Sequence, residues 1–139
     1  MRIRVVSSRE EIESLSKKVK GEKIIHLAFR PSNKDIFDLV KSCPKVKAIH
    51  IPGSYMKTVS DSTKMLLEMQ GIALLEGDVW GHRKDINEYS EIKQEVFDKI
   101  ERLKSEGLSE SDISKRMERE TGLSKDLLLF LMKGKGKKK

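Results

Sequence analysis

The sequence predicts an α/β fold: a small, mainly parallel four-stranded sheet with crossover helices, followed by a C-terminal three-helix unit that resembles a helix-turn-helix. Strand-like and helix-like segments alternate through the first half of the chain, and parallel strands need crossovers of this length. In addition, the tripeptide IHL at 25–27 returns as IHI at 49–51, and the same interval ends inside the apolar run 72–75. Such spacing is typical of an open sheet or of a leucine-rich-repeat-like stack. We favour the sheet because no leucine-rich consensus recurs.

Four strands and three helices are predicted before residue 78. The strand patterns begin at residues 3, 23, 46 and 72, and they read IRVVSS, KIIHLAFR, VKAIHIPG and IALLEG. The helix patterns cover residues 8–21, 32–44 and 60–71. The first helix begins at a Ser8 N-cap and ends at Gly21, and the second begins at Ser32 or Asn33 and ends at Pro44.

Pleating divides the strand side chains between two faces of the predicted sheet. The first face carries large apolar groups and should pack under the crossover helices; its members are Ile25, Leu27, Phe29, Ile49 and Ile51. The opposite face is more polar; its members are Ile24, His26, Ala28, Arg30, Ala48 and His50. We expect the helix that begins near Ser90 to cover this second face.

Three helix patterns follow in direct succession, at 91–107, 109–122 and 124–134. The second begins at Ser109 and stops at Gly122, and the third begins at Ser124. We therefore divide the chain into an α/β domain at 1–89, a helix-turn-helix-like unit at 90–132 and a disordered lysine-rich tail at 133–139. Six successive apolar residues at 127–132 cover every face of the last helix, which predicts burial in a core or in a dimer interface.

Charge and composition limit the classes of function. The formal net charge is +7, but the tail KGKGKKK holds five lysines and no acid, so the rest of the chain is close to balanced. No apolar run approaches the roughly 18 to 20 residues that span a bilayer, and the first residues lack the apolar core of a signal peptide. We expect a cytoplasmic protein without a membrane partner. The single Cys43 excludes an internal disulfide and a cysteine-based zinc cluster.

Polar residues gather where the predicted strands end, which is where open parallel sheets bind ligands. Arginines can grip a phosphate or carboxylate there, aromatic rings can stack on a ligand, and a carboxylate with a histidine can move protons. No glycine-rich phosphate motif or nucleophile elbow occurs, so we predict no catalytic residue and no cofactor. The predicted site for a small anionic ligand comprises Arg30, Ser32, Asn33, Tyr55, Glu76, Asp78, Trp80, His82 and Arg83. Alternatively, the rim is polar only because loops are, and Asp78 pairs with Arg83 to order the linker.

His26 and His50 form a second constellation. If the repeated tripeptide sets the strand register, the two residues lie side by side, about 4.8 Å apart at the backbone, and can share a proton or a metal ion. A metal would need a third ligand, for which only Glu76 or His82 is near in the predicted fold. The alternative is a pair of half-buried histidines that are hydrogen-bonded to a covering helix. We predict no metal site.

The C-terminal helices suggest contact with nucleic acid. In a helix-turn-helix, the helix that starts at Ser124 would enter the major groove, and the lysine tail would neutralise phosphates. Base readout is opposed by the apolar last helix and by the charge of residues 91–132, which hold eight Lys or Arg against ten Asp or Glu. The helices then favour assembly, and we predict a homodimer through them. The predicted nucleic-acid contacts are Lys115, Arg116, Arg119, Lys125, Lys133, Lys135, Lys137, Lys138 and Lys139.

Three segments carry a family resemblance: IIHLAFRPSNKDIFDLV, CPKVKAIHIP and IALLEGDVWGHRKDINEY. They resemble an uncharacterised family of small archaeal proteins, a domain of unknown function that is common among methanogens. The resemblance covers roughly residues 1–92 and extends less clearly to the C-terminal helices. It implies an archaeal cytoplasmic protein with a compact α/β unit, and it implies no activity.

The favoured hypothesis is a non-enzymatic, nucleic-acid-associated or regulatory protein that joins an α/β sensor-like domain to a helix-turn-helix-like unit. The alternative is a small-metabolite or anionic-ligand binding protein, or an enzyme, with its site at the carboxyl rim and with helices that serve oligomerisation. A third hypothesis is an adaptor whose helices bind another protein.

Overall fold

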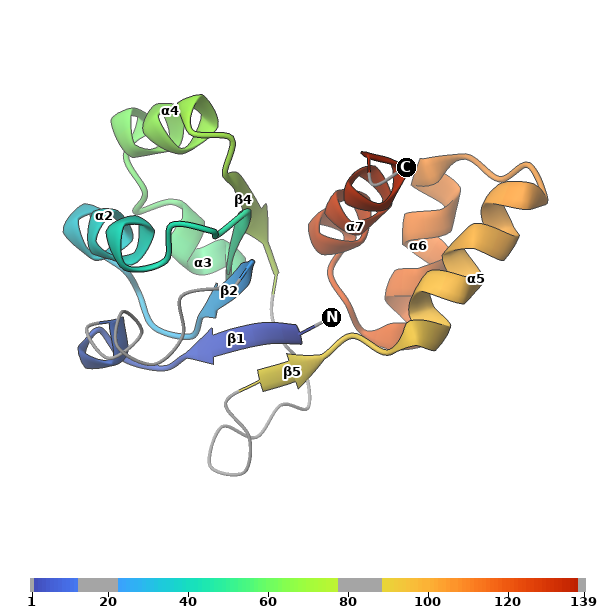
Figure 1. Ribbon diagram of the computed structural model, residues 1–139, viewed down its shortest axis with the longest axis horizontal. Helices are drawn as coiled ribbons and strands as arrows, with labels where there is room; N and C mark the ends of the chain where they lie inside the picture. The colour runs from blue at the N-terminus through green and yellow to red at the C-terminus, as the bar shows by residue number, and fades with distance from the viewer. Residues whose placement is uncertain (1, 13–22, 78–88, 138–139) are drawn as a thin grey trace.

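The computed structural model describes residues 2–12, 23–77 and 89–137. Within these ranges, five strands form one sheet in the order β4-β3-β2-β1-β5 (Figure 1). The strands are β1 (Arg2–Val6), β2 (Ile24–Leu27), β3 (Ala48–Ile51), β4 (Ala73–Glu76) and β5 (Tyr89–Glu91). Strands β1 to β4 are parallel, as the sequence predicts. Strand β5 pairs antiparallel with β1 and was not predicted, because three residues are too few to show a strand period.

Strands β1 to β4 cross the sheet in sequence order, so the connections between them lie on one face. These connections contain α2 (Asn33–Ser42), α3 (Gly53–Met56) and α4 (Asp61–Met69), which Figure 1 shows together on one side of the sheet. Residues 10–12 are helical and begin the helix predicted at 8–21, whose remainder lies outside the described residues. The short α3 was not predicted.

The face beneath these helices forms the first core. Ile25, Leu27, Ile49 and Ile51 are fully buried against α2 and α4, as the alternation of the strands predicts. The helix side of this cluster is formed by Ile36, Leu39 and Leu67, with Phe29 partly buried at its margin. The buried thiol of Cys43 belongs to the same cluster.

The opposite face of the sheet is covered by the helical unit, which consists of α5 (Gln94–Ser105), α6 (Glu110–Thr121) and α7 (Lys125–Lys137). Leu127 and Leu131 of α7 pack there against Ile24 and Leu75. The expectation that the helix near Ser90 covers this face therefore needs correction, because residues 89–91 extend the sheet and α5 starts only at Gln94. The start of the helical unit still contributes to the same cluster, through Ile92, Val96 and Phe97.

Helix α7 is buried on both sides. Leu128 and Met132 point away from the sheet cluster and pack against Ile100 of α5 and Ile113 of α6. The apolar run 127–132 therefore closes the chain's own core, with Leu129 and Phe130 half-buried at its margins. A homodimer through the C-terminal helices stays a prediction.

Two boundaries differ from those predicted. The sheet extends to Glu91, two residues past the predicted end of the α/β domain. Helix α7 continues to Lys137, so residues 133–137 are helical where a disordered tail was expected; lysine favours helix, although Gly134 and Gly136 do not. Residues 138–139 lie outside the described part. Every helix in the described ranges is too short or too polar to cross a membrane.

Candidate functional site

Two histidines meet on the sheet face that α7 covers. His26 and His50 are register partners on β2 and β3, as the repeated tripeptide predicts. Their Nδ1 atoms lie 2.8 Å apart, their ring centroids are 4.9 Å apart, and both residues are buried. A hydrogen bond between two Nδ1 atoms needs one proton, so one ring donates it and the other accepts it.

The second nitrogen of His50 connects the sheet to the helical unit. Its Nε2 atom lies 2.9 Å from Oγ of Ser124, the residue that immediately precedes α7. The same Oγ accepts a hydrogen bond from the backbone N–H of Leu127 at 3.2 Å, so Ser124 caps the helix, as its sequence position predicts. If the Ser124 hydroxyl donates to Nε2, His50 carries its proton on Nδ1 and donates it to His26. If Nε2 donates to Ser124, His26 is the donor within the pair. Both orders leave the two rings neutral.

Burial sets the charge of His50. Loss of solvation, followed by the effect of neighbouring His26, lowers the pKa of His50 from 6.5 to about 3. His50 is therefore uncharged at neutral pH and acts as a hydrogen-bonding group.

The same geometry is a poor metal site. Nitrogen ligands of a tetrahedral zinc ion stand about 2.0–2.1 Å from it and so further from each other than the observed 2.8 Å between the two Nδ1 atoms. The part of the chain that the structure describes contains no group of three or more His, Cys, Asp or Glu arranged to hold a metal. Of the third ligands considered, His82 lies outside the described residues.

Gly77 lets β4 approach this junction. Its N–H donates to the Ile51 carbonyl at 2.8 Å, and its φ is +152°. A Cβ atom at this position would lie 2.2 Å from Cβ of Ser124 and 2.7 Å from Nε2 of His50. Only glycine fits between the end of the strand and the cap of α7 without moving them.

A second hydrogen bond fixes α7 to the edge of the sheet. The carboxylate of Asp126 accepts the backbone N–H of Glu76 at 2.9 Å. Strand β4 is an edge strand, and this N–H is one that no neighbouring strand occupies. Asp126 thus ties the first turn of α7 to β4, next to the bond between Ser124 and His50.

An open cavity of about 470 Å³ adjoins these contacts. It lies between the ends of β3 and β4, the C-terminal end of α6 and the first turn of α7. Its charged residues are three acids and one lysine, and the full lining consists of Gly53, Glu76, Gly77, Glu118, Gly122, Ser124, Lys125 and Asp126. Glu76 was predicted for an anionic-ligand site. The described residues around it supply two more carboxylates and one lysine, a balance of charge that does not favour an anion.

The predicted rim residues fall into separate groups. The guanidinium carbon of Arg30 stands 5.1 Å from the centre of the Tyr55 ring, so these two lie together. The Ser32 hydroxyl caps α2 by accepting the N–H of Asp35. The side-chain amide oxygen of Asn33 accepts the backbone N–H of Ser60 and the Thr63 hydroxyl. Ser32 and Asn33 therefore hold the backbone here. Asp78, Trp80, His82 and Arg83 lie outside the described residues.

The order of strands β1 to β4 does not provide the crevice on which the predicted rim site depends. A crevice opens at the carboxyl edge of a parallel sheet where neighbouring strands send their connections in opposite directions. Strands β1 to β4 make no such reversal, because each is followed by its next neighbour in the same direction. The chain reverses only on its way from β4 to β5, through residues that the structure does not describe.

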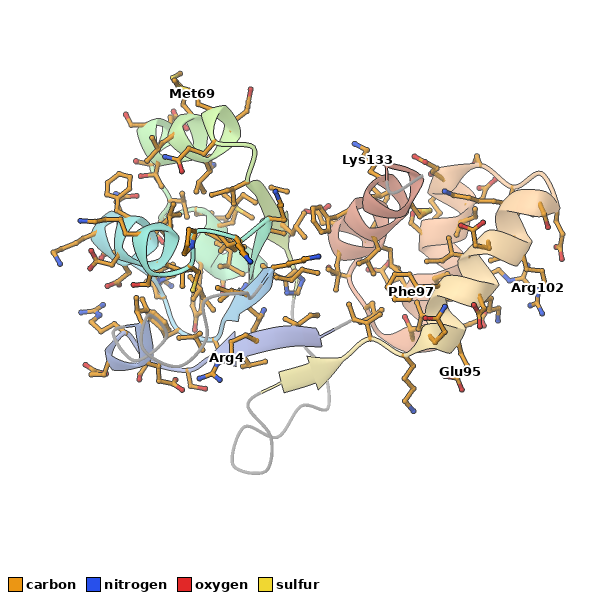
Figure 2. The ribbon with its side chains drawn as sticks, in the orientation of Figure 1. Arg4, Met69, Glu95, Phe97, Arg102 and Lys133 are labelled. Atoms are coloured by element: carbon orange, nitrogen blue, oxygen red, sulfur yellow. The ribbon has the colours of Figure 1, made fainter. Side chains whose placement is uncertain are left out.

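The predicted nucleic-acid contacts lie on the outside of the helical unit. Lys115, Arg116 and Arg119 are exposed on α6, and Lys125 and Lys133 are exposed on α7. Figure 2 shows Lys133 directed away from the rest of the unit. The side chains of Lys135, Lys137, Lys138 and Lys139 lie outside the described part.

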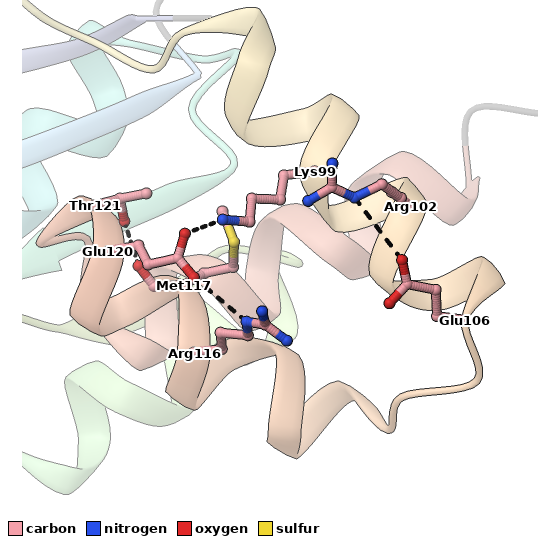
Figure 3. Close-up of polar contacts among 7 residues, drawn as sticks. All are labelled: Lys99, Arg102, Glu106, Arg116, Met117, Glu120 and Thr121. Atoms are coloured by element: carbon pink, nitrogen blue, oxygen red, sulfur yellow. Dashed lines mark hydrogen bonds and ion pairs between the residues drawn. The ribbon is translucent and has the colours of Figure 1, made fainter.

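The three cations of α6 differ in their partners. Arg116 pairs with Glu120 at 3.4 Å, and Glu120 also pairs with Lys99 of α5 (Figure 3). The hydrogen bond from Lys99, and then the pairing with Arg116, lowers the pKa of the Glu120 carboxyl. Among the described residues, Lys115 and Arg119 form no ion pair.

Sequence reasoning identified the histidine pair and the Ser124 cap separately but did not bring them together. It also missed Gly77 and Asp126 as parts of the junction. A glycine directly after a predicted strand is a usable signal of close approach. No sequence pattern indicates which helix will meet that glycine.

Comparison with known families finds two models, each matching a different part of the chain. Residues 2–88 match the model described as "Family of unknown function (DUF1699) N-terminal domain". Residues 95–133 match the model described as "Protein of unknown function (DUF1699) C-terminal HTH domain", where HTH stands for helix-turn-helix. No curated protein and no solved structure matches the chain. The second range contains α5, α6 and most of α7.

Proposed function

This chain belongs to the DUF1699 family, and we propose that it is a non-enzymatic, nucleic-acid-associated or regulatory protein. The observation that supports the proposal is the match of residues 95–133 to a helix-turn-helix domain, in a range where three successive helices are found. Helix-turn-helix domains commonly bind DNA. The α/β unit, joined to the helices through α7, would act as the sensor or support.

The proposed contacts are the exposed cations of α6 and α7, together with the lysines that follow. Lys115, Arg116 and Arg119 stand on one helix, and Lys125 and Lys133 stand near the two ends of α7. The remaining contacts would be Lys135, Lys137, Lys138 and Lys139. These side chains bind phosphates as cations and release counterions when they do so.

Binding is tested by fluorescence anisotropy of labelled duplex DNA and of labelled single-stranded RNA, titrated with the whole chain from about 50 to 200 mM salt. We expect saturable binding that weakens as the salt concentration rises. A variant in which four C-terminal lysines are changed to glutamine measures how much they contribute to the affinity; these are Lys135, Lys137, Lys138 and Lys139. If the whole chain binds neither nucleic acid at the lowest salt, the proposal fails.

The alternative function is a small anionic-ligand site at the carboxyl rim. The supporting observation is the position of Arg30 over the Tyr55 ring, which offers a cation and an aromatic surface together. Thermal unfolding with inorganic phosphate and with nucleoside monophosphates tests it, since a bound ligand raises Tm. Arg30→Ala should remove any such rise, whereas Lys64→Ala, at an exposed position of α4, should not.

We propose a cytoplasmic protein, an archaeal origin as the family resemblance implies, and a homodimer. The dimer was predicted from the apolar residues of α7, four of which are buried within the chain. Light scattering coupled to gel filtration measures the mass of the species, and a monomer would overturn the dimer proposal alone.

A further inference from the structure

The third helix of a helix-turn-helix normally carries the residues that read DNA. Its N-terminal residues approach the base edges in the major groove, while the helix before it crosses the backbone. Here the third helix is α7, and its N-terminal residues are already engaged. Ser124 is hydrogen-bonded to His50, and Asp126 is hydrogen-bonded to the backbone of Glu76. The side chains of Ser124 and Asp126 are therefore not free to contact base edges while the two units are joined.

Between Gly77 and Ser124 the contact is close. A single added methyl group at Gly77 would lie 2.2 Å from Cβ of Ser124. The backbone directly after β4 therefore packs against the cap of α7. The covering element is part of the same chain and belongs to the sheet.

The central part of α7, residues 127–132, has no side chain that suits base readout. Base edges are recognised by hydrogen-bonding side chains such as Arg, Lys, Asn and Gln. The central part of α7 consists of apolar residues, of which Leu127 and Leu131 pack on the sheet and Leu128 and Met132 pack among the helices. Freeing α7 would expose both its own apolar side chains and the sheet face with Ile3, Ile24 and Leu75.

Helix α6 presents the accessible cations. Lys115 and Arg119 are exposed, stand about 6 Å apart along the helix axis, and form no ion pair among the described residues. Arg116 shares Glu120 with Lys99, so its charge is partly balanced. Figure 1 shows α7 running antiparallel to α6, and Figure 2 shows the exposed Lys133 near the end of the unit where α6 begins.

The partner that fits this surface is double-stranded. Proteins that hold single strands stack the bases on exposed aromatic side chains. In the described part of the helical unit, the aromatic residues are Phe97 and Phe130, and both are half-buried in the cluster between α7 and the sheet. Cations without stacking rings suit the phosphates of a duplex.

We infer that α7 is a docking helix rather than a reading helix, and that the protein binds the phosphate backbone of duplex DNA, irrespective of sequence, through Lys115 and Arg119 of α6 with the exposed Lys133 of α7. This inference rests on the proposed function and specifies its binding surface. The sheet covers the side of α7 that would otherwise select a base sequence.

The test compares variants of the whole chain on several unrelated duplexes of equal length by fluorescence anisotropy over a salt series. The wild type should bind all of them with Kd values within about threefold of one another, because phosphate contacts carry no sequence information. The double variant Lys115→Ala with Arg119→Ala should weaken binding roughly tenfold or more. It should also reduce the slope of log K against log salt by about 1.8, since each phosphate contact contributes about 0.9.

Two sets of control variants are used. The first tests whether any loss of positive charge weakens DNA binding, and the second tests whether α7 contacts the DNA. Lys45→Ala with Lys64→Ala removes two exposed lysines of the α/β unit and should change affinity less than twofold. Ser124→Ala and Gly77→Ala leave the net charge unchanged and weaken the docking of α7. Each should leave DNA affinity unchanged at a temperature where circular dichroism shows it folded, and two variants are used in case one does not fold.

The outcomes are distinct. Preference for one duplex by about a hundredfold, or tighter binding by either docking variant, would mean that α7 reads DNA and would overturn the inference while the proposed function stands. Equal loss in the Lys45 and Lys64 control would overturn the assignment to α6. Preference for single-stranded RNA over duplex would overturn the choice of partner. Absence of binding in every variant at low salt would remove the proposed function itself.

Discussion

His26 and His50 are joined by an Nδ1-to-Nδ1 contact of 2.8 Å, buried between the sheet and α7. The two rings share one proton through this contact. The other ring nitrogen of His50, Nε2, is hydrogen-bonded to the Ser124 hydroxyl, which caps α7. Packing between the two units is therefore linked to the neutral state of a histidine.

Acid should destabilise the protein through His50. Its pKa is about 3 in the folded chain and 6.5 when solvated, so the unfolded chain binds more protons between these values. Stability is then greatest above pH 6.5 and falls as the pH drops toward 3. Between pH 7 and pH 4 the loss from this group is on the order of 3 kcal/mol. Urea unfolding over this range measures it. His50→Gln should flatten the pH dependence, and an unchanged slope in that variant would contradict the assignment.

Removal of the Ser124 hydroxyl should cost more than the loss of an ordinary helix cap. Ser124→Ala loses the bond to the Leu127 N–H and leaves Nε2 of buried His50 without this partner. We expect a loss of about 2–4 kcal/mol in the free energy of unfolding. Ser109→Ala is the matched control, because Ser109 caps α6 but contacts no histidine, and it should cost about 1 kcal/mol. Equal losses in urea unfolding would show that the histidine bond contributes nothing.

A methyl group at Gly77 should disrupt the junction. Gly77→Ala places a Cβ atom within 3 Å of Ser124 and His50, and it also strains a backbone with positive φ. Gly107→Ala is matched for the backbone effect, because its φ is +91° and an added Cβ meets nothing within 4 Å. We expect the Gly77 variant to lose at least about 2 kcal/mol more than the Gly107 variant. The comparison is made by thermal and urea unfolding. Similar losses would mean that the strand end moves away easily.

The carboxylate of Asp126 should stabilise the edge of the sheet. Asp126→Ala removes the acceptor of the Glu76 N–H and a negative charge in the first turn of α7. Asp61→Ala removes only the first-turn charge of α4, so the difference between the two variants isolates the hydrogen bond. We expect that difference to be about 1 kcal/mol, because the bond is exposed. Hydrogen exchange should also quicken at the Glu76 amide in the Asp126 variant alone.

The parts of the fold that could be predicted are those with a local periodic signal. Alternation along β2 and β3 assigned their side chains to the correct faces, and the repeated tripeptide predicted the register of His26 with His50. The caps at Ser32, Ser109 and Ser124 were also predicted and are observed. These features depend on neighbours within a few residues, or on one regular spacing.

The parts that could not be predicted depend on contacts between distant segments. Strand β5 has three residues and owes its conformation to pairing with β1. Helix α7 packs on the second sheet face because of the packing of the whole chain. The sequence does not show this, since α5 carries an equally clear apolar stripe. Asn33 looked like a ligand-binding residue at a strand end, but its side chain is used by Ser60 and Thr63. A polar residue in a loop gives no sign of whether a ligand or the protein itself satisfies it.

The one-sided winding of the sheet has a consequence for synthesis of the protein. When strands β1 to β4 leave the ribosome, their crossover segments can cover only one face of the sheet. The other face stays exposed to solvent until α7 has been translated. During that interval Ile3, Ile24 and Leu75 form an exposed, aggregation-prone apolar surface on the incomplete nascent chain. The two sequence ranges that match separate family models are thus interdependent in folding, and the first should aggregate when it is produced alone.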